Sequence, residues 1–237
     1  MGERLTTIID RARTRRWLHI VVIVMRMLLG FAFLPAGLKK LLAEPFTDPS
    51  NVGTFHVFLH GFHDTGVFYR FVGALQLIAA VLLLTQRFAS LGALLLTPIL
   101  VAILVFCWST GVIPTASVVT LMTFGLGLLL LWDIHRWRAL VARPGETVQI
   151  ALPTPHPSID MRLWTMCGAA ILVLYLVSTA LAGEVYRPRG ADWSNPSFVV
   201  LQVIAVLPII TFIVDYRRRH RTAERQTADQ SKNSAKS

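Results

Sequence analysis

Arg26 is the residue whose type and position in this sequence most strongly suggest chemistry. It lies inside a long apolar segment, residues 17–38, about where a bilayer would be driest. A charged side chain at that depth costs about 2.5–3.5 kcal/mol on insertion scales, so it usually faces other helices and usually has a role. A guanidinium there could bind an anionic or electron-rich group, such as a lipid phosphate or a quinone carbonyl.

The residues that share a helix face with Arg26 extend this candidate site. At steps of four, three, four and three residues they are Arg26, Gly30, Phe33, Gly37 and Lys40, which fall within roughly 80° of arc. The second apolar segment has a matching face with Tyr69, Gly73 and Gln76. Small residues let membrane helices approach closely, so we expect the two faces to pack together and to form a ligand site.

Within this site, Gln76 is expected at the depth of Arg26, where its carbonyl could accept a hydrogen bond from the guanidinium. Such a bond leaves the positive charge uncompensated, which favours an anionic or electron-rich ligand. The alternative is a structural arginine whose partners are backbone carbonyls, water or Asp133.

Three histidines form a second candidate site between the first two apolar segments. His56, His60 and His63 share one side of an amphipathic helix that we predict over about residues 50–63, starting at Asp48-Pro49. Histidines at i and i+4 are a known metal-ligand spacing. The alternatives are a proton-handling surface or simply the wet side of an interfacial helix.

The two cysteines argue against thiol chemistry. Cys107 and Cys167 are expected in opposite leaflets, too far apart for a disulfide, which needs Cα atoms within about 7 Å. Any electron transfer would therefore need a bound cofactor or a partner protein.

The composition identifies the elements that must position these residues. Hydrophobic residues make up 54% of the 237 positions and charged residues 15%, against about 25% charged in soluble domains. Segments of this length and character predict membrane-spanning helices. The six expected spans are residues 17–38, 67–85, 88–110, 116–132, 163–183 and 197–216.

Lysine and arginine placement predicts that both termini are cytoplasmic. In this orientation the inner segments hold 17 of the 23 Lys and Arg residues, as the positive-inside rule requires. The net charge of +10 then reflects topology and contact with anionic lipid, and no nucleic-acid partner is expected.

Loop lengths predict an all-α fold with a four-helix up-down bundle followed by a two-helix hairpin. The expected parts are a basic tail (residues 1–16), the bundle (17–137), a proline-rich linker (138–161), the hairpin (162–217) and a disordered basic and polar tail (218–237).

The chain resembles the DoxX family of small bacterial membrane proteins over about residues 20–137. The resemblance lies in the pattern Arg26-x3-Gly30-x2-Phe33-x3-Gly37-x2-Lys40, in the apolar run of residues 73–84 and in the tight turn at Gln86-Arg87. It implies a four-helix membrane bundle in the inner (plasma) membrane of a bacterium. It also implies a role as a subunit linked to thiosulfate:quinone oxidoreduction or to another membrane redox complex. Related four-helix proteins act as membrane chaperones. This chain departs from the family at Gln76, where a glutamate is frequent.

These observations support three functional hypotheses. The first is a redox-associated membrane subunit that holds a quinone-like or lipidic ligand near Arg26 and Gln76. The second is a non-catalytic membrane scaffold or chaperone, and the third is a transporter of lipids or small molecules. The sequence specifies no cofactor by itself, and a quinone is the one that the first hypothesis would need.

Overall fold

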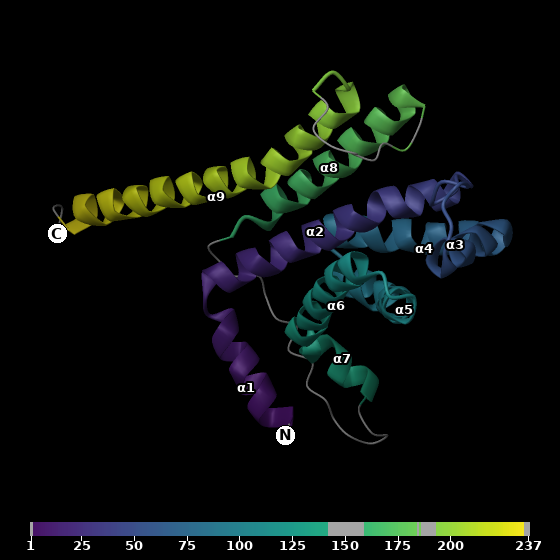
Figure 1. The fold of residues 1–237 in the computed structure, drawn as a ribbon. Helices are drawn as coiled ribbons and strands as arrows, with labels where there is room; N and C mark the ends of the chain where they lie inside the picture. The colour runs from purple at the N-terminus through teal and green to yellow at the C-terminus, as the bar shows by residue number, and fades with distance from the viewer. Residues whose placement is uncertain (1, 142–158, 184, 186–192, 235–237) are drawn as a thin grey trace.

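The computed structural model describes residues 2–141, 159–183, 185 and 193–234, and every regular element among them is a helix (Figure 1). The helices are α1 (Gly2–Arg13), α2 (Arg16–Leu41), α3 (Thr54–Asp64), α4 (Val67–Leu84), α5 (Ala89–Ser109), α6 (Ile113–Trp132), α7 (Ile134–Val141), α8 (Met161–Ala182) and α9 (Pro196–Ser234). Six are long and apolar enough to cross a membrane: α2, α4, α5, α6, α8 and the first part of α9. The predicted polytopic all-α membrane fold is confirmed.

Helix α2 is the centre of the molecule. It packs against α4, α6 and α8, while α4 packs on α5, α5 on α6, and α8 on α9. In Figure 1 the α8–α9 pair lies above α2, and α5 and α6 lie below it. We call the end at which α2 and α8 begin and α4 and α6 end the basic end, and the opposite end, near α3, the histidine end.

Glycines let α2 and α4 approach closely. A Cβ atom added at Gly37 would lie 2.9 Å from the carbonyl oxygen of Gly73, and one at Gly73 would lie 2.6 Å from Cβ of Lys40. A Cβ at Gly30 would meet Leu84 at 2.9 Å. Any side chain at these three positions would force the helices apart, which explains the small residues in the sequence pattern.

The α8–α9 hairpin docks on this pair through another glycine. A Cβ atom at Gly168 would overlap the backbone carbonyl of Leu84, and Trp164, one turn earlier, is fully buried. At the basic end the Arg16 guanidinium donates to the Asp215 carboxylate at 2.7 Å. Asp215 also accepts from the backbone N–H of Asp160, just before α8, at 3.0 Å. The hairpin is thus attached to α2 and α4 by close packing and by a buried ion pair.

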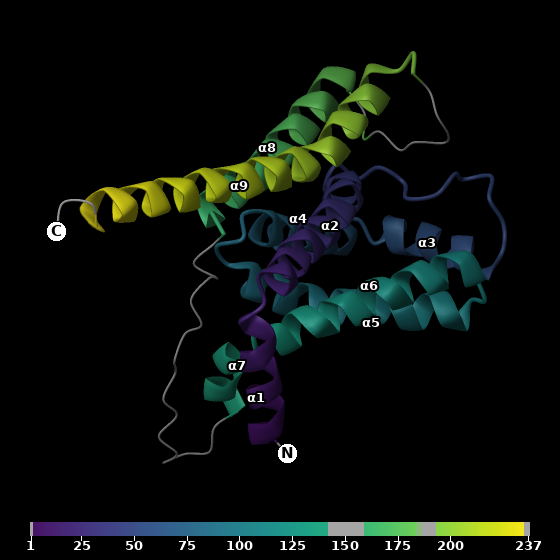
Figure 2. The ribbon, with the colours of Figure 1, turned by 90° about the vertical axis from the view of Figure 1, so that its left-hand side faces the viewer.

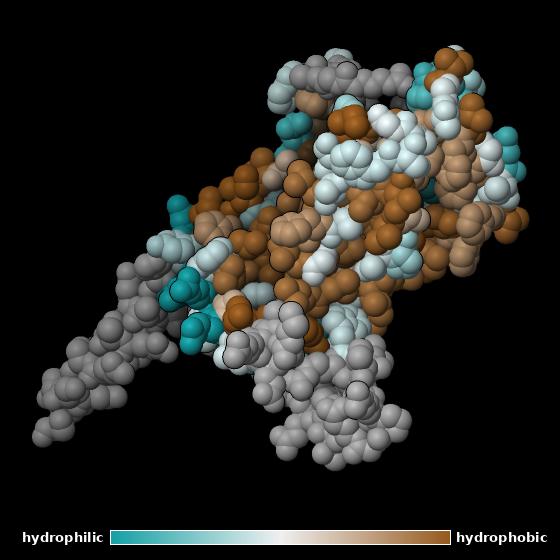
Figure 3. All heavy atoms as spheres, turned by 60° about the horizontal axis from the view of Figure 1, so that its bottom comes forward, coloured by the Kyte–Doolittle hydropathy of each residue, from teal (hydrophilic) through white to brown (hydrophobic). Residues whose placement is uncertain are grey.

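The outer faces of the spans are apolar. Large side chains such as Leu121, Phe124 and Leu181 are 72%, 68% and 84% exposed. Figure 3 shows apolar residues covering most of the flank of the helices, with polar ones towards its margins. Such a surface requires a lipid environment.

Two short helices lie together at the basic end. Figure 2 shows α1 beside α7, and the His135 ring nitrogen lies 2.9 Å from the Asp10 carboxylate, which joins them. The segment expected as a basic tail therefore contains a helix. Residues 142–158 of the predicted linker lie outside the described residues.

Two predicted boundaries were wrong. Helix α3 begins at Thr54 and not near residue 50, because Gly53 adopts a φ of 108° and Asp48 instead accepts hydrogen bonds from Ser50 in a local turn. Helix α9 continues to Ser234, whereas disorder was expected from residue 218. A helix that is already nucleated extends at little cost through residues of moderate propensity, such as those of this tail.

Candidate functional site

Arg26 forms an ion pair with Asp133, the residue that caps α6. The Nη2–Oδ2 distance is 2.9 Å, and the two side chains are 11% and 6% exposed. Ser90 at the start of α5 donates to the same carboxylate oxygen at 2.6 Å. This ion pair is the structural alternative for Arg26, with Asp133 as its partner. The predicted bond to Gln76 and the uncompensated charge were wrong. The Arg26 guanidinium instead lies at the level of the C-terminal end of α6, beside the Asp133 carboxylate.

Gln76 lies in the α2–α4 interface, where it is 1% exposed and its Oε1 bonds to no described group. The other members of the predicted site on these helices, Gly30, Phe33, Gly37 and Gly73, are buried in the same contact. Because the helix backbones touch at the three glycines, this interface is packed protein at those levels. Arg26 departs from the set, since its side chain extends towards α6.

The remaining two residues of the predicted site, Lys40 and Tyr69, lie at the histidine end. Lys40 is 6% exposed, donates to the Ala36 carbonyl at 3.2 Å, and lies 4.3 Å from the centre of the Phe46 ring. The Tyr69 hydroxyl donates to the Glu44 carbonyl at 2.8 Å. Both residues hold the segment that follows α2.

The three histidines bind the same segment. His56 Nδ1 lies 2.7 Å from the Thr47 hydroxyl, and His60 Nε2 and His63 Nε2 lie 3.3 and 3.1 Å from the carbonyls of Asp48 and Ala43. No group of three or more metal-ligating side chains occurs in the described part of the chain. The metal hypothesis is thus not supported there, since each ring meets its own partner on residues 43–48.

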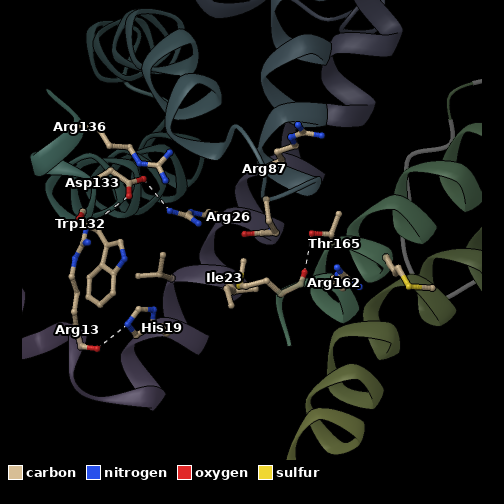
Figure 4. Close-up of a pocket in the computed structure, with 14 residues that line it drawn as sticks. Arg13, His19, Ile23, Arg26, Arg87, Trp132, Asp133, Arg136, Arg162 and Thr165 are labelled. Atoms are coloured by element: carbon tan, nitrogen blue, oxygen red, sulfur yellow. Dashed lines mark hydrogen bonds and ion pairs between the residues drawn. The ribbon is translucent and has the colours of Figure 1, made fainter. Parts of the chain in front are cut away.

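A pocket of about 630 Å³ opens at the basic end, between α2, the α4–α5 turn, the end of α6 and the start of α8 (Figure 4). Its apolar wall includes Val22, Ile23 and Met166. Its polar lining consists of Arg13, His19, Arg26, Gln86, Arg87, Trp132, Asp133, Arg136, Arg162 and Thr165. Figure 4 shows Arg26 and Asp133 on one side of this space and Arg162 and Thr165 on the other.

The pocket is strongly cationic: among the described residues, its lining has five arginines and one acidic residue, Asp133. Arg26 pairs with Asp133, and Arg13 lies 4.0 Å from that carboxylate. Burial lowers the pKa of Arg13, an effect that the charge of Asp133 opposes. An arginine remains protonated near neutral pH despite such a shift.

Three arginines of the pocket are available to a ligand. The side chains of Arg87, Arg136 and Arg162 are exposed, and none forms an ion pair with a carboxylate among the described side chains. They come from the α4–α5 turn, α7 and α8, which lie far apart in sequence. This convergence was missed because we interpreted these arginines only as topology signals.

Gln86 adds a buried acceptor to this pocket. It is 6% exposed and adopts a φ of +60°, which reverses the chain between α4 and α5. Its Nε2 donates to the Leu83 carbonyl at 3.1 Å, while its buried Oε1 has no hydrogen-bond partner in the described structure. A buried polar atom without a partner is unfavourable unless something else supplies one.

Comparisons with known proteins agree with this architecture. The DoxX family model matches residues 21–108, which include α2 from its second turn, α4 and almost all of α5. The uncharacterized protein YwoB of Bacillus subtilis (strain 168) is 31% identical over 119 residues, which are 47% of this chain and 75% of that protein. No solved structure matches the chain. The glycine-packed α2–α4 pair lies inside the matched region, and the chain belongs to the DoxX family.

Proposed function

We propose that this protein binds a lipidic ligand whose electron-rich or anionic head group occupies the pocket at the basic end. The observation that carries the proposal is the lining, in which the described residues include five arginines and a single acidic residue, Asp133. Arg26 already neutralises that carboxylate, so the remaining cations attract an anion from outside the chain. In membrane proteins, basic pockets between helices on the cytoplasmic side are typical sites for lipid head groups.

The apolar wall of the pocket suits the rest of such a ligand. Val22 and Ile23 of α2 and Met166 of α8 line the same space as the arginines. An acyl or isoprenoid chain could lie along these side chains while its head group stays among the guanidinium groups. We also propose that the basic end faces the cytoplasm, because that orientation satisfies the positive-inside rule.

A quinone is the second candidate ligand. His19 and Trp132 line the pocket and meet edge to face, with ring centroids 5.0 Å apart. The aromatic wall would accommodate a flat ring, and the neighbouring arginines would donate hydrogen bonds to its carbonyls. In this case the protein would serve a membrane redox complex as its quinone-holding subunit, and electrons would pass through the bound quinone or a partner.

Identification of the co-purified ligand tests the proposal. The protein is purified in mild detergent, extracted with organic solvent, and analysed by mass spectrometry for lipids and quinones. We expect wild type to retain a ligand that the double variant Arg87→Ala/Arg162→Ala loses. Arg70→Ala, which removes an exposed arginine outside the pocket, is the matched control and should retain it. Equal retention by all three, or retention by none, would contradict the proposal.

A further inference from the structure

The pocket combines cations with a buried hydrogen-bond acceptor, Gln86 Oε1, that has no donor within the described structure. Gln86 Oε1 lies in a lining rich in guanidinium groups, yet it bonds to none of the described side chains. Its orientation is fixed because the Nε2 of the same amide donates to the Leu83 carbonyl at 3.1 Å. Turning the amide over would place an oxygen against that carbonyl, so Oε1 remains the atom that needs a donor.

A ligand that satisfies the whole pocket must therefore carry two different groups. One is an anion for Arg87, Arg136 and Arg162, for which a phosphate offers the best match in charge and geometry. The other is a hydroxyl or similar donor for Gln86. An anion alone would bring further acceptor oxygens towards an acceptor, which leaves Gln86 unsatisfied and adds repulsion.

We propose that the head group is a polyol phosphate, with the phosphate on the arginines and a hydroxyl donating to Gln86 Oε1. The proposal rests on the lipid-binding function proposed above and narrows it to a chemical class. Phosphatidylglycerol represents this class among lipids, because its head group combines one phosphodiester with two free hydroxyls. sn-Glycerol 3-phosphate carries the same chemistry without acyl chains.

Other head groups fit less well. Phosphatidic acid supplies the phosphate but no polyol, and phosphatidylcholine replaces the hydroxyl donors with a cation that five arginines would repel. An oxidised quinone supplies carbonyl acceptors only. Each of these ligands leaves either the arginines or Gln86 without a suitable partner.

The test measures lipid preference for the full chain in detergent. Delipidated protein is incubated with phosphatidylglycerol, phosphatidic acid or phosphatidylcholine of identical acyl chains, and the bound lipid is quantified by native mass spectrometry. Gln86→Met keeps the side-chain length and removes the acceptor, and Arg162→Ala removes a cation but keeps the acceptor. sn-Glycerol 3-phosphate, added as competitor, distinguishes a free polyol phosphate from a lipid head group.

We expect wild type to prefer phosphatidylglycerol to phosphatidic acid by roughly two- to tenfold, the value of one hydrogen bond to a neutral group. Gln86→Met should bring this ratio close to one, whereas Arg162→Ala should weaken both lipids and keep the ratio. Displacement of the lipid by millimolar glycerol phosphate would identify the free compound as the ligand, and resistance would identify the lipid.

The outcomes separate this inference from the function on which it rests. If wild type binds no anionic lipid and no glycerol phosphate, the proposed function fails. If wild type binds anionic lipid but prefers phosphatidic acid, or if Gln86→Met keeps the wild-type ratio, the pocket still binds lipid and the polyol inference is wrong. If Gln86→Met proves unstable, Arg162→Ala still tests the polyol inference. In that variant the preference for phosphatidylglycerol over phosphatidic acid must survive.

Discussion

The guanidinium of Arg26 and the carboxylate of Asp133, separated by 107 positions in the sequence, meet at 2.9 Å and join the first span to the end of the fourth. Both side chains are nearly inaccessible, at 11% and 6% exposed. The most unusual charge in the sequence is thus used within the protein, as a cross-link between helices. The arginines that remain for a ligand are others, contributed by the α4–α5 turn, α7 and α8.

The Arg26–Asp133 pair should show strong coupling in a double-mutant cycle. Removing one partner of a buried ion pair leaves the other charge uncompensated, which typically costs about 3–5 kcal/mol. Asp133→Ala should be at least as harmful as Arg26→Ala, because Arg13 also lies 4.0 Å from that carboxylate. The double variant should lose less stability than the sum of the two.

Thermal unfolding in detergent, followed by tryptophan fluorescence, measures this cycle. Arg70→Ala, which changes an exposed arginine, provides the baseline for loss of a surface charge. Strictly additive losses would mean that the two side chains do not interact.

Arg16 and Arg15 offer a matched comparison for the attachment of the hairpin. Arg16 donates to the buried Asp215 at 2.7 Å, whereas its neighbour Arg15 is exposed. We expect Arg16→Ala to lower the free energy of unfolding by a few kcal/mol because it leaves Asp215 buried without its counter-ion. Arg15→Ala should change it by less than about 0.5 kcal/mol. Chemical denaturation in mixed micelles compares them, and similar effects at both positions would show that the ion pair does not hold the hairpin.

Alanine substitution at two helical glycines should change the stability of the protein in opposite directions. At Gly168 a Cβ atom would overlap the Leu84 carbonyl, while at Gly127 it would meet nothing within 4 Å. Gly168→Ala should therefore destabilise the protein and Gly127→Ala should stabilise it, by up to about 1 kcal/mol from helix propensity. The midpoint of thermal unfolding distinguishes them, and stabilisation by both substitutions would disprove the close docking of α8 on α4.

The histidines at the other end should stabilise a loop rather than bind a metal. His63→Ala removes a hydrogen bond to the Ala43 carbonyl at 3.1 Å and an aromatic contact with Tyr69. This loss should cost about 1 kcal/mol and speed up amide hydrogen exchange in residues 43–52. Hydrogen exchange with mass spectrometry detects the change. Zinc at micromolar concentration should leave the exchange of wild type unaltered, and strong protection by zinc would restore the metal hypothesis.

Much of the fold could be predicted because the bilayer restricts it. Spans must be long, apolar and helical, so six were located within a few residues of their observed ends. The α2–α4 contact was also predictable. Gly30 and Gly37 lie on one face of the first segment, Gly73 lies on the matching face of the second, and consecutive spans run antiparallel. These conclusions needed only local patterns and the alternating direction of consecutive spans.

The candidate site was harder to predict because it depends on how distant helices meet. Asp133, at the end of a span, was one of several alternative partners for Arg26, and the sequence alone does not show that α2 places Arg26 at that level. The arginines at positions 87, 136 and 162 each have an ordinary explanation as topology signals. Only the packing of α6 and α8 on two sides of α2 brings them to one pocket.

The separation of Arg26 from Asp133 also has a consequence for biogenesis. The first span leaves the ribosome with its cation, but the matching acid is synthesised 107 residues later, on the order of ten seconds at typical elongation rates. During that interval the nascent helix must keep a guanidinium hydrated at the lipid boundary or shielded by the insertion machinery. Completion of the fourth segment would therefore fix the first in place, so that the order of translation and the order of assembly differ.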